Sequence, residues 1–435
     1  MRITPTLLVS LALSLAPALG RAQESALPAL RTAAHDTTWQ LRFGRALRRA
    51  GHFDEAWRVL QGVTGVAAIR NDVLWELARV RFDQGVFQPA RGACMAFPAP
   101  RGDAAASLRR HICLARAYLL WNRVALAERE ITAARAVAPS DPELLLVIAD
   151  SRRLASDLQG AEEAYRAAEA ALPGRNDAAL GLGQLYEMFQ RPDPAQQQYT
   201  RALEIDADDP IASMLAGRFL LRRRERPADA IAHLRRATEN RPAWAEALGL
   251  YGDALLQTGA HEDALRALQE AARLSPTQPG VQTNLGRTLI ALNRFPEAEA
   301  PLRLAIRQVD TDANAHMGLA DVLEHTGRDT DAMQTWDAAI DRAPGAVTPR
   351  FRAAQLAHRT HQDALARAYL DRVLTDDPQL APAHYLRGVI AMDQGERTAA
   401  RQAFTAALAG HGEVDREDIQ RRIQELDAPP RVRRR

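Results

Sequence analysis

Apolar residues recur along this chain with a fixed period, and a small residue marks each period. An alanine returns in the same phase eleven times, at Ala56, Ala90, Ala127, Ala161, Ala195, Ala230, Ala264, Ala298, Ala332, Ala366 and Ala400. Successive alanines are 34 residues apart, except for one step of 37 and one of 35. Alanine is abundant in this sequence, so one match carries little information, whereas eleven matches in phase indicate an internal repeat.

Two further series keep the same phase. About twelve residues before each alanine lies another small residue: Gly44, Ala78, Ala115, Ala149, Gly183, Gly217, Gly252, Gly286, Ala320, Ala354 and Gly388. Four residues after each alanine lies a large side chain or a cysteine: Leu60, Cys94, Ile131, Tyr165, Tyr199, Leu234, Leu268, Leu302, Trp336, Leu370 and Phe404. A small residue in mid-helix lets a second helix approach closely, and a large residue one turn away fills the adjoining space. Each unit is therefore expected to be a helical hairpin.

The ends of each unit support this interpretation. The segment between the two halves often contains Gly or Asn, which suits a tight turn, and a proline often follows the second half, which ends a helix. A single hairpin cannot bury its apolar face alone, so consecutive units must stack. The pattern predicts an all-α solenoid of eleven units that start near residues 37, 71, 108, 142, 176, 210, 245, 279, 313, 347 and 381.

These offsets resemble those of the tetratricopeptide repeat (TPR) family. The resemblance covers residues 37–414 and is strongest over residues 142–346. It weakens towards the ends, where Val63, Phe97 and Val373 replace the usual alanine and three residues are inserted within 98–107. The resemblance implies a right-handed superhelical solenoid, and its members share a shape rather than a chemistry.

The two ends of the chain differ from the repeats. Residues 1–22 combine Arg2, an apolar stretch and small residues up to Ala22, which is the layout of a secretory signal peptide, with an uncleaved anchor as the alternative. We expect a linker over residues 23–36, a capping helix over 415–427 and a basic disordered tail over 428–435. The expected location is the periplasm or the exterior, or the periphery of the outer membrane, with no transmembrane segment after signal cleavage.

Charge and composition narrow the classes of function. All 56 basic residues are Arg, against 54 acidic residues, for a net charge of +2. A near-balanced charge gives no reason to expect a nucleic-acid partner. The absence of Lys removes mechanisms that need a Lys nucleophile or a phosphate-loop Lys.

Motifs for catalysis and metal binding are also missing from the sequence. Gly181 and Gly183 do not continue into a dinucleotide loop, because Tyr186 stands where a third small residue belongs. His358 and His361 are one turn apart but have no third ligand nearby. We expect no catalytic residues, no metal and no cofactor. Cys94 and Cys113 form either a disulfide or two buried thiols, and export favours the disulfide.

The resemblance also implies where a partner would bind. In the family, the first helix of each hairpin lines the concave face of the solenoid. The fifth position of the units is mostly apolar and includes Trp75, Ile112, Leu146, Leu180, Met214, Met317, Phe351 and Tyr385. The ninth position is mostly polar and includes Arg79, Arg116, Arg218 and Arg287. These residues are our candidate groove. The alternative is that the apolar ones only fill the contacts between neighbouring first helices.

The sequence therefore predicts a non-enzymatic exported scaffold or adaptor. We expect it to bind a protein or peptide partner in its concave groove and to support assembly of a cell-envelope complex. The second hypothesis is a periplasmic solenoid arm of a polysaccharide export or secretion apparatus. The partner, the physiological process and the oligomeric state stay open.

Overall fold

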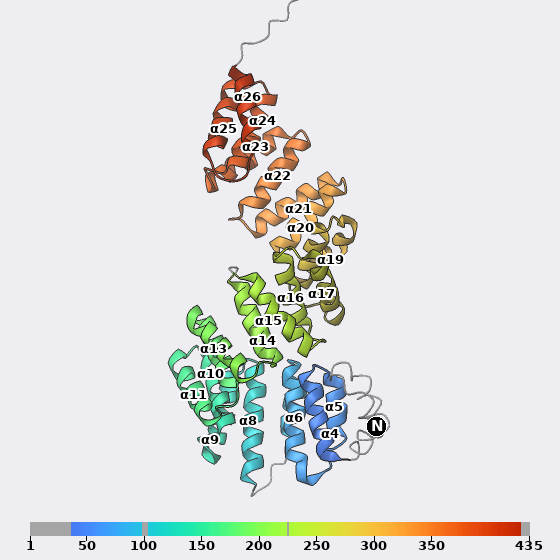
Figure 1. The fold of residues 1–435 in the computed structure, drawn as a ribbon, viewed down its shortest axis with the longest axis vertical. Helices are drawn as coiled ribbons and strands as arrows, with labels where there is room; N and C mark the ends of the chain where they lie inside the picture. The colour runs from blue at the N-terminus through green and yellow to red at the C-terminus, as the bar shows by residue number, and fades with distance from the viewer. Residues whose placement is uncertain (1–35, 98–102, 224–225, 428–435) are drawn as a thin grey trace, which may run out of the picture. The chain divides into compact units, whose positions relative to one another are not determined.

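The computed structural model describes residues 36–97, 103–223 and 226–427 (Figure 1). Within these ranges the chain forms 23 α-helices, one short 3-10 helix and no β-strand. The predicted all-α solenoid of helix–turn–helix repeats is confirmed. The predicted signal peptide, nearly all of the predicted linker, the basic tail and part of the 98–107 insertion lie outside the described residues.

The chain divides into two compact units, residues 1–258 and 259–435. The helices of unit 1 are α4 (Thr37–Arg49), α5 (Phe53–Gln61), η1 (Ala67–Ile69), α6 (Arg70–Asp83), α7 (Phe87–Met95), α8 (Ala104–Leu120), α9 (Val124–Val137), α10 (Pro142–Leu154), α11 (Leu158–Ala171), α12 (Asp177–Met188), α13 (Pro192–Ile205), α14 (Pro210–Arg222), α15 (Pro227–Asn240) and α16 (Ala245–Gln257). From α4 to α15 they pack as six consecutive hairpins.

Unit 2 repeats the same arrangement. Its helices are α17 (His261–Leu274), α18 (Val281–Ala291), α19 (Phe295–Gln308), α20 (Ala313–His325), α21 (Asp329–Arg342), α22 (Val347–Arg359), α23 (Asp363–Asp376), α24 (Ala381–Asp393), α25 (Arg397–Ala409) and α26 (Arg416–Asp427). Helices α18 to α25 form four hairpins. The last helix, α26, packs on α25 and buries Ile419 completely, as a helix covering the end of a core would.

Close approach within each hairpin depends on the small and large residues of the repeat. Gly183 lies in α12 opposite Tyr199 of α13, and a Cβ atom at residue 183 would come 2.5 Å from the Tyr199 ring. The same pairing joins Gly388 to Phe404 in unit 2. The Tyr199 ring is almost completely buried, so the contact fixes the helix spacing as well as filling the core.

Helix starts are set by local capping. The Asp141 side chain accepts a hydrogen bond from the backbone N of Leu144 at 3.0 Å, and Pro142 occupies the first turn of α10. Asp209 caps α14 in the same way ahead of Pro210. An Asp cap satisfies free N–H groups, and Pro has none to lose at the start of a helix.

A disulfide joins Cys94 of α7 to Cys113 of α8, with the Cα atoms 5.4 Å apart. Both residues are fully buried, so the bond connects the second and third hairpins inside the core. Among the described helices, none is both long and apolar enough to cross a membrane.

Candidate functional site

The apolar residues of the candidate groove divide into a buried and a partly exposed set. Ile112, Leu146, Leu180 and Met214 have exposed fractions of 9% or less and belong to one core cluster of unit 1. Neighbouring first helices contact one another in this unit, as α6 does with α8 and α8 with α10. These four side chains therefore do not form an exposed stripe, and their burial agrees with the alternative that they fill the contacts between helices.

The partly exposed set contains Trp75 in unit 1 and Met317, Phe351 and Tyr385 in unit 2. Trp75 lies beside Arg116, whose guanidinium carbon is 5.4 Å from the ring centroid. The Tyr385 hydroxyl donates a hydrogen bond to Asp418 of α26 at 2.9 Å, so this side chain is engaged by the last helix. Trp75 is consequently the candidate aromatic anchor on the first helices of unit 1.

The four candidate arginines differ in their ion pairs. Arg116 is 2.6 Å from Glu143 of the next first helix. Arg218 is 3.8 Å from Glu187 and 3.8 Å from Glu246, and Arg287 of unit 2 donates to Asn284 at 3.3 Å. Arg79 has one ion pair, with Glu76 at 3.8 Å on its own helix.

Charged side chains continue across the first helices of unit 1 from α4 to α12. At one end, the buried Glu76 of α6 is 3.0 Å from Arg45 and 3.2 Å from Arg48, both on α4. Arg48 also donates to Asp83 at 2.6 Å. We call the set that begins here the charged strip of unit 1; its members are Arg45, Arg48, Glu76, Arg79, Asp83, Arg116, Glu143, Arg175 and Asp177.

At the other end of the charged strip, Arg175 joins two carboxylates. Its guanidinium forms an ion pair with Glu143 and lies 2.8 Å from Asp177. Burial alone would raise the pKa of Glu143, but the charges of Arg116 and Arg175 outweigh burial and lower it. Burial would likewise raise the pKa of Asp177, and Arg175 reverses this effect. Both carboxylates are therefore held in their charged form.

A polar cavity of about 750 Å³ adjoins the charged strip. It is bounded by the C-terminal parts of α4 and α6, the N-terminal parts of α12 and α14, and the end of α15. Its charged lining is balanced and consists of Arg48, Arg49, Arg79, Arg175, Arg241, Asp83, Asp177, Asp206, Asp208 and Asp209. We refer to it as the polar cavity of unit 1.

Arg241 brings the sixth hairpin of unit 1 against the first. Its guanidinium carbon is 4.7 Å from the ring centroid of Phe53 and 4.4 Å from that of Trp244. The side chain is only 4% exposed, and its Nε atom has no hydrogen-bond partner among the described residues. Burial lowers the pKa of Arg241; Asp83, Glu246 and Asp209 act against this effect, and Arg48 adds to it. Sequence reasoning missed this residue, because it lies outside the positions that the repeat singles out.

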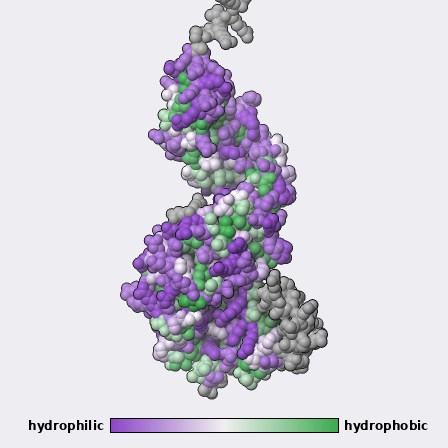
Figure 2. Space-filling view, in the orientation of Figure 1, coloured by the Kyte–Doolittle hydropathy of each residue, from purple (hydrophilic) through white to green (hydrophobic). Residues whose placement is uncertain are grey.

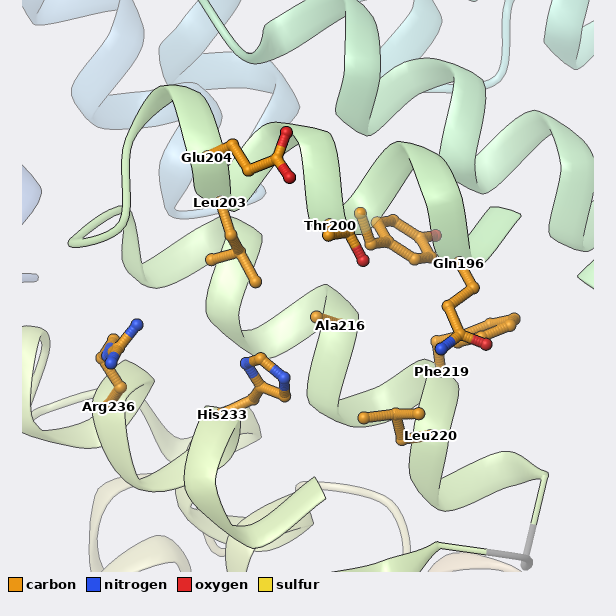
Figure 3. Close-up of a pocket in the computed structure, with 10 residues that line it drawn as sticks. Gln196, Thr200, Leu203, Glu204, Ala216, Phe219, Leu220, His233 and Arg236 are labelled. Atoms are coloured by element: carbon orange, nitrogen blue, oxygen red, sulfur yellow. The ribbon is translucent and has the colours of Figure 1, made fainter. Parts of the chain in front are cut away.

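A second hollow lies between α13 and α15, over α14 (Figure 3). Its floor is apolar and includes Phe219 and Leu220 of α14, whereas Thr200 and Leu203 of α13 and His233 of α15 lie on its walls. It measures about 340 Å³. On the face of the molecule drawn in Figure 2, hydrophilic residues predominate and the hydrophobic ones are scattered, so no broad apolar docking patch is visible there.

The described residues contain no group of three or more His, Cys, Asp or Glu side chains placed to hold a metal ion. His358, one of the two histidines one turn apart, makes a hydrogen bond of 2.8 Å to Asp363. His361 occupies the turn between α22 and α23 with a left-handed backbone, φ 59°.

Comparison with known families identifies the class of protein. A tetratricopeptide repeat model matches residues 155–210, 180–243, 220–279 and 351–414, and a second one matches residues 255–316. Together the matches cover just over half of the chain, which therefore belongs to the tetratricopeptide repeat family. This confirms the resemblance seen in the sequence. The fold is typically a non-catalytic scaffold for protein–protein interaction.

Individual relatives are more distant. The chain is 28% identical over 262 residues to Cellulose synthase operon protein C of Xanthomonas axonopodis pv. citri (strain 306). That match takes in 58% of this chain but only 16% of the relative, so the chain spans about one-sixth of the relative's length.

Two solved structures are similar at lower identity. A tetratricopeptide repeat protein from Parabacteroides merdae ATCC 43184 is 18% identical, with a TM-score of 0.44 over 58% of this chain and 99% of that one. Pseudomonas aeruginosa pilF is 22% identical, with a TM-score of 0.43 over 51% of this chain and 97% of that one.

Proposed function

We propose that this protein is an exported TPR scaffold that binds a protein or peptide partner along the first helices of its repeats and supports assembly of a cell-envelope complex. The observation that supports the proposal is the charged strip of unit 1. Side chains of successive hairpins pair with one another there, as Arg48 does with Asp83 and Arg116 with Glu143. Such a row of charges can set the register and orientation of an extended partner.

Trp75 and Arg116 are the proposed anchors of this interface. Trp and Arg dominate the binding energy of many protein interfaces, and here the two side chains lie together on adjacent first helices. The buried members of the candidate groove, such as Leu180 and Met214, belong to the core cluster against which Trp75 packs. The partner therefore meets polar side chains around one aromatic ring rather than an apolar stripe.

The test is affinity capture from an envelope extract with the full mature chain beside Trp75→Ala and Arg116→Gln variants. The matched controls are Trp121→Ala and Arg123→Gln. These two residues also form an arginine–tryptophan contact, at 4.4 Å, but they lie in the turn of the hairpin that contains Arg116. Loss of a large interface aromatic commonly weakens binding by about 2 kcal/mol or more. We expect the captured protein to be lost with the Trp75 and Arg116 variants and kept with both controls.

The purified partner then gives a dissociation constant for each variant by calorimetry. An equal loss of affinity for the partner in the Trp75 and Trp121 variants would contradict the proposed surface. Failure of the mature chain to enrich any envelope protein over an unrelated TPR control would contradict the scaffold proposal itself.

Export is tested separately. A fusion of residues 1–36 to a phosphatase that is active only after export is expected to be active and cleaved after Ala22. The substitution Leu11→Arg, which places a charge in the apolar stretch, is expected to abolish this activity. Cytoplasmic retention of the wild-type fusion would contradict the envelope location.

Similarity to Cellulose synthase operon protein C supports a second candidate function. In that case the chain is the periplasmic solenoid arm of a polysaccharide export apparatus. Its deletion is then expected to lower the amount of exported polysaccharide while leaving polymer synthesis in membranes unchanged. Normal export in the deletion strain would exclude this function and leave the protein-binding scaffold.

A further inference from the structure

Exposed apolar side chains of unit 1 gather at its hairpin turns. Among the described residues, eight large hydrophobic side chains have exposed fractions between 37% and 47%. Five of them lie at four consecutive turns of unit 1, namely Val86, Leu120, Trp121, Leu154 and Met188. The other three, Met95, Val137 and Val309, lie at the ends of second helices, away from the turns. Single exposed hydrophobic residues need no explanation, whereas a group at successive turns indicates an interaction surface.

Three of these turns share one geometry. Leu120, Leu154 and Met188 are the last residues of α8, α10 and α12. Two residues later each turn has a left-handed backbone, at Asn122, Ser156 and Gln190. Because consecutive first helices pack against one another, their ends are about 10 Å apart. The three side chains therefore form a row along the turn side of unit 1.

The row is widest at the second and third hairpins. Phe87, the first residue of α7, stacks on Trp121 with the ring centroids 4.4 Å apart, and the exposed Val86 precedes it. The guanidinium carbon of Arg123 is also 4.4 Å from the centroid of a Trp121 ring that is 44% exposed. Tryptophan and arginine side chains combine in this way at lipid–water interfaces. We call Val86, Phe87, Leu120, Trp121, Leu154 and Met188 the apolar turn row.

Arginine predominates among the charged residues around the apolar turn row. Arg123 and Arg191 are exposed in the third and fifth turns. In the sixth hairpin, Arg222 ends α14 and Arg223 follows it, as Met188 and Phe189 do in α12. Three neighbouring acids, Asp83, Asp157 and Glu187, accept hydrogen bonds from Arg48, the backbone N of Gly160 and the hydroxyl of Tyr199. Asp193 is exposed, in the first turn of α13. The charge beside the row is therefore mainly positive, which complements an anionic surface.

Exposed polar residues separate the apolar side chains. Asn122, Ser156 and Gln190 stand between the end of one helix and the start of the next. A dry protein interface would bury these groups, which costs free energy unless the partner supplies hydrogen bonds. In the headgroup layer of a membrane they stay hydrated while the apolar side chains reach the acyl boundary. The alternation favours a lipid surface over a second protein.

We propose that the apolar turn row binds the surface of a membrane that carries anionic lipids. Its side chains enter the boundary between the headgroups and the acyl chains, and Arg123, Arg191 and Arg222 lie among the phosphates. The row consists of different residues from the protein interface around Trp75 and Arg116. Binding to lipid therefore does not require the protein partner proposed above.

Flotation with lipid vesicles tests this proposal. The mature chain, which lacks the apolar stretch of the predicted signal peptide, is mixed with vesicles of phosphatidylcholine and phosphatidylglycerol in equal amounts. Vesicles of phosphatidylcholine alone are the second probe. We expect the wild type to float with the mixed vesicles. We expect weaker flotation with phosphatidylcholine alone or at high salt, because both reduce the attraction between the arginines and the membrane surface.

Variants of the row assign the surface. Met188→Glu and Trp121→Ala are each expected to lower partitioning into the mixed vesicles by about tenfold or more, because each removes an apolar side chain from the boundary. Met95→Glu is the matched control and is expected to float as the wild type does. Both methionines end a helix, with exposed fractions of 45% and 47%, but Met95 lies at the opposite end of its hairpin.

The contribution of charge is tested by the double variant Arg191→Gln/Arg222→Gln. It is expected to weaken partitioning into the mixed vesicles by about tenfold or more and to change binding to phosphatidylcholine little, since each arginine near an anionic surface contributes about fivefold. Equal effects on the two kinds of vesicle would overturn the assignment of the arginines to the phosphates.

Folding of every variant is checked by its melting temperature. Absence of wild-type flotation with the mixed vesicles would overturn the proposal, as would equal losses in Met188→Glu and Met95→Glu. A dimer that Met188→Glu dissociates, without any flotation, would also overturn it and assign the row to a second copy of this chain. Trp121→Ala is expected to lose the vesicles and keep the captured protein partner, whereas Trp75→Ala is expected to do the reverse. The two proposed surfaces can therefore fail independently.

Discussion

One residue in each hairpin turn that the structure describes adopts a left-handed backbone, and its identity varies along the chain. Glycine or asparagine stands there in several hairpins, with φ 85° at Gly51 and 58° at Asn293. Three turns use other residues, namely Ser156, Gln190 and His361. A side chain other than glycine in this region costs about 1 kcal/mol or more, so the repeat tolerates local strain at these three turns.

The Gln190→Gly variant is expected to stabilise unit 1 by about 1 kcal/mol, because glycine adopts φ 55° without a Cβ clash. The measurement is the free energy of unfolding from urea denaturation. Gln197→Gly serves as the matched control, since Gln197 is exposed in the middle of α13, where glycine costs about 1 kcal/mol. If Gln190→Gly lowers the free energy of unfolding as Gln197→Gly does, Gln190 is not strained.

At the scale of the helix, much of the architecture could be predicted from the sequence. The small-residue series and the large-residue series keep the same phase in the repeat. Their pairing across the hairpin, as between Gly183 and Tyr199, therefore follows from the sequence. The exposure of the fifth position could not be predicted in the same way. Whether Leu180 or Met214 faces a partner or a neighbouring helix depends on how closely consecutive first helices approach, and the period does not specify that distance.

The burial of Met214 leads to a direct prediction. Met214→Glu is expected to destabilise unit 1 by about 3 kcal/mol or more, because it places a carboxylate in the core without a partner. Met188→Glu is the control, since Met188 lies on the preceding first helix with 45% of its surface exposed and is expected to change stability by less than about 0.5 kcal/mol. Thermal and urea unfolding measure both. A Met214→Glu variant as stable as the Met188→Glu variant would show that residue 214 is accessible to water.

The disulfide acts between elements, joining α7 to α8. The bond closes a segment of 19 residues, so its loss is expected to cost about 3 kcal/mol in the unfolding free energy. Cys94→Ser/Cys113→Ser and the reduced wild type are compared with the oxidised wild type. Titration of the unfolded, unreduced protein is expected to find no reactive thiol. Two reactive thiols, or no change of stability on reduction, would contradict a structural disulfide.

At the scale of the whole unit, the contacts that sequence reasoning missed are those between repeats that are distant along the chain. Arg241 reaches Phe53 only because five further hairpins bring the end of α15 back to the first one. Each hairpin can be predicted from local spacing. The small rotations between consecutive hairpins, however, add up along the unit and decide which distant hairpins meet. The sequence therefore predicts the repeats well and does not predict which distant side chains meet, including those of the polar cavity.

The charged strip gives unit 1 a dependence on pH whose sign follows from its carboxylates. The folded pKa values of Glu143 and Asp177 are lowered against burial by Arg116 and Arg175. Their stabilisation is therefore complete above the unfolded pKa of about 4 and is lost as the pH falls through the lower folded values. Hydrogen exchange of α10 amides, measured from pH 6 to pH 3, reports the stability of unit 1 locally.

Glu143→Gln is expected to lower the protection of α10 at pH 6 and to make it less dependent on pH below 4. Adding Arg116→Gln to this variant is expected to flatten the dependence only a little further, because Arg116 pairs directly with Glu143 and acts on Asp177 less than Arg175 does. Since Arg175 contacts both Glu143 and Asp177, a residual dependence from Asp177 should persist in the double variant. Parallel pH curves for the wild type and Glu143→Gln would mean that Glu143 titrates alike in the folded and unfolded chain, and that the charged strip orients its side chains without stabilising unit 1.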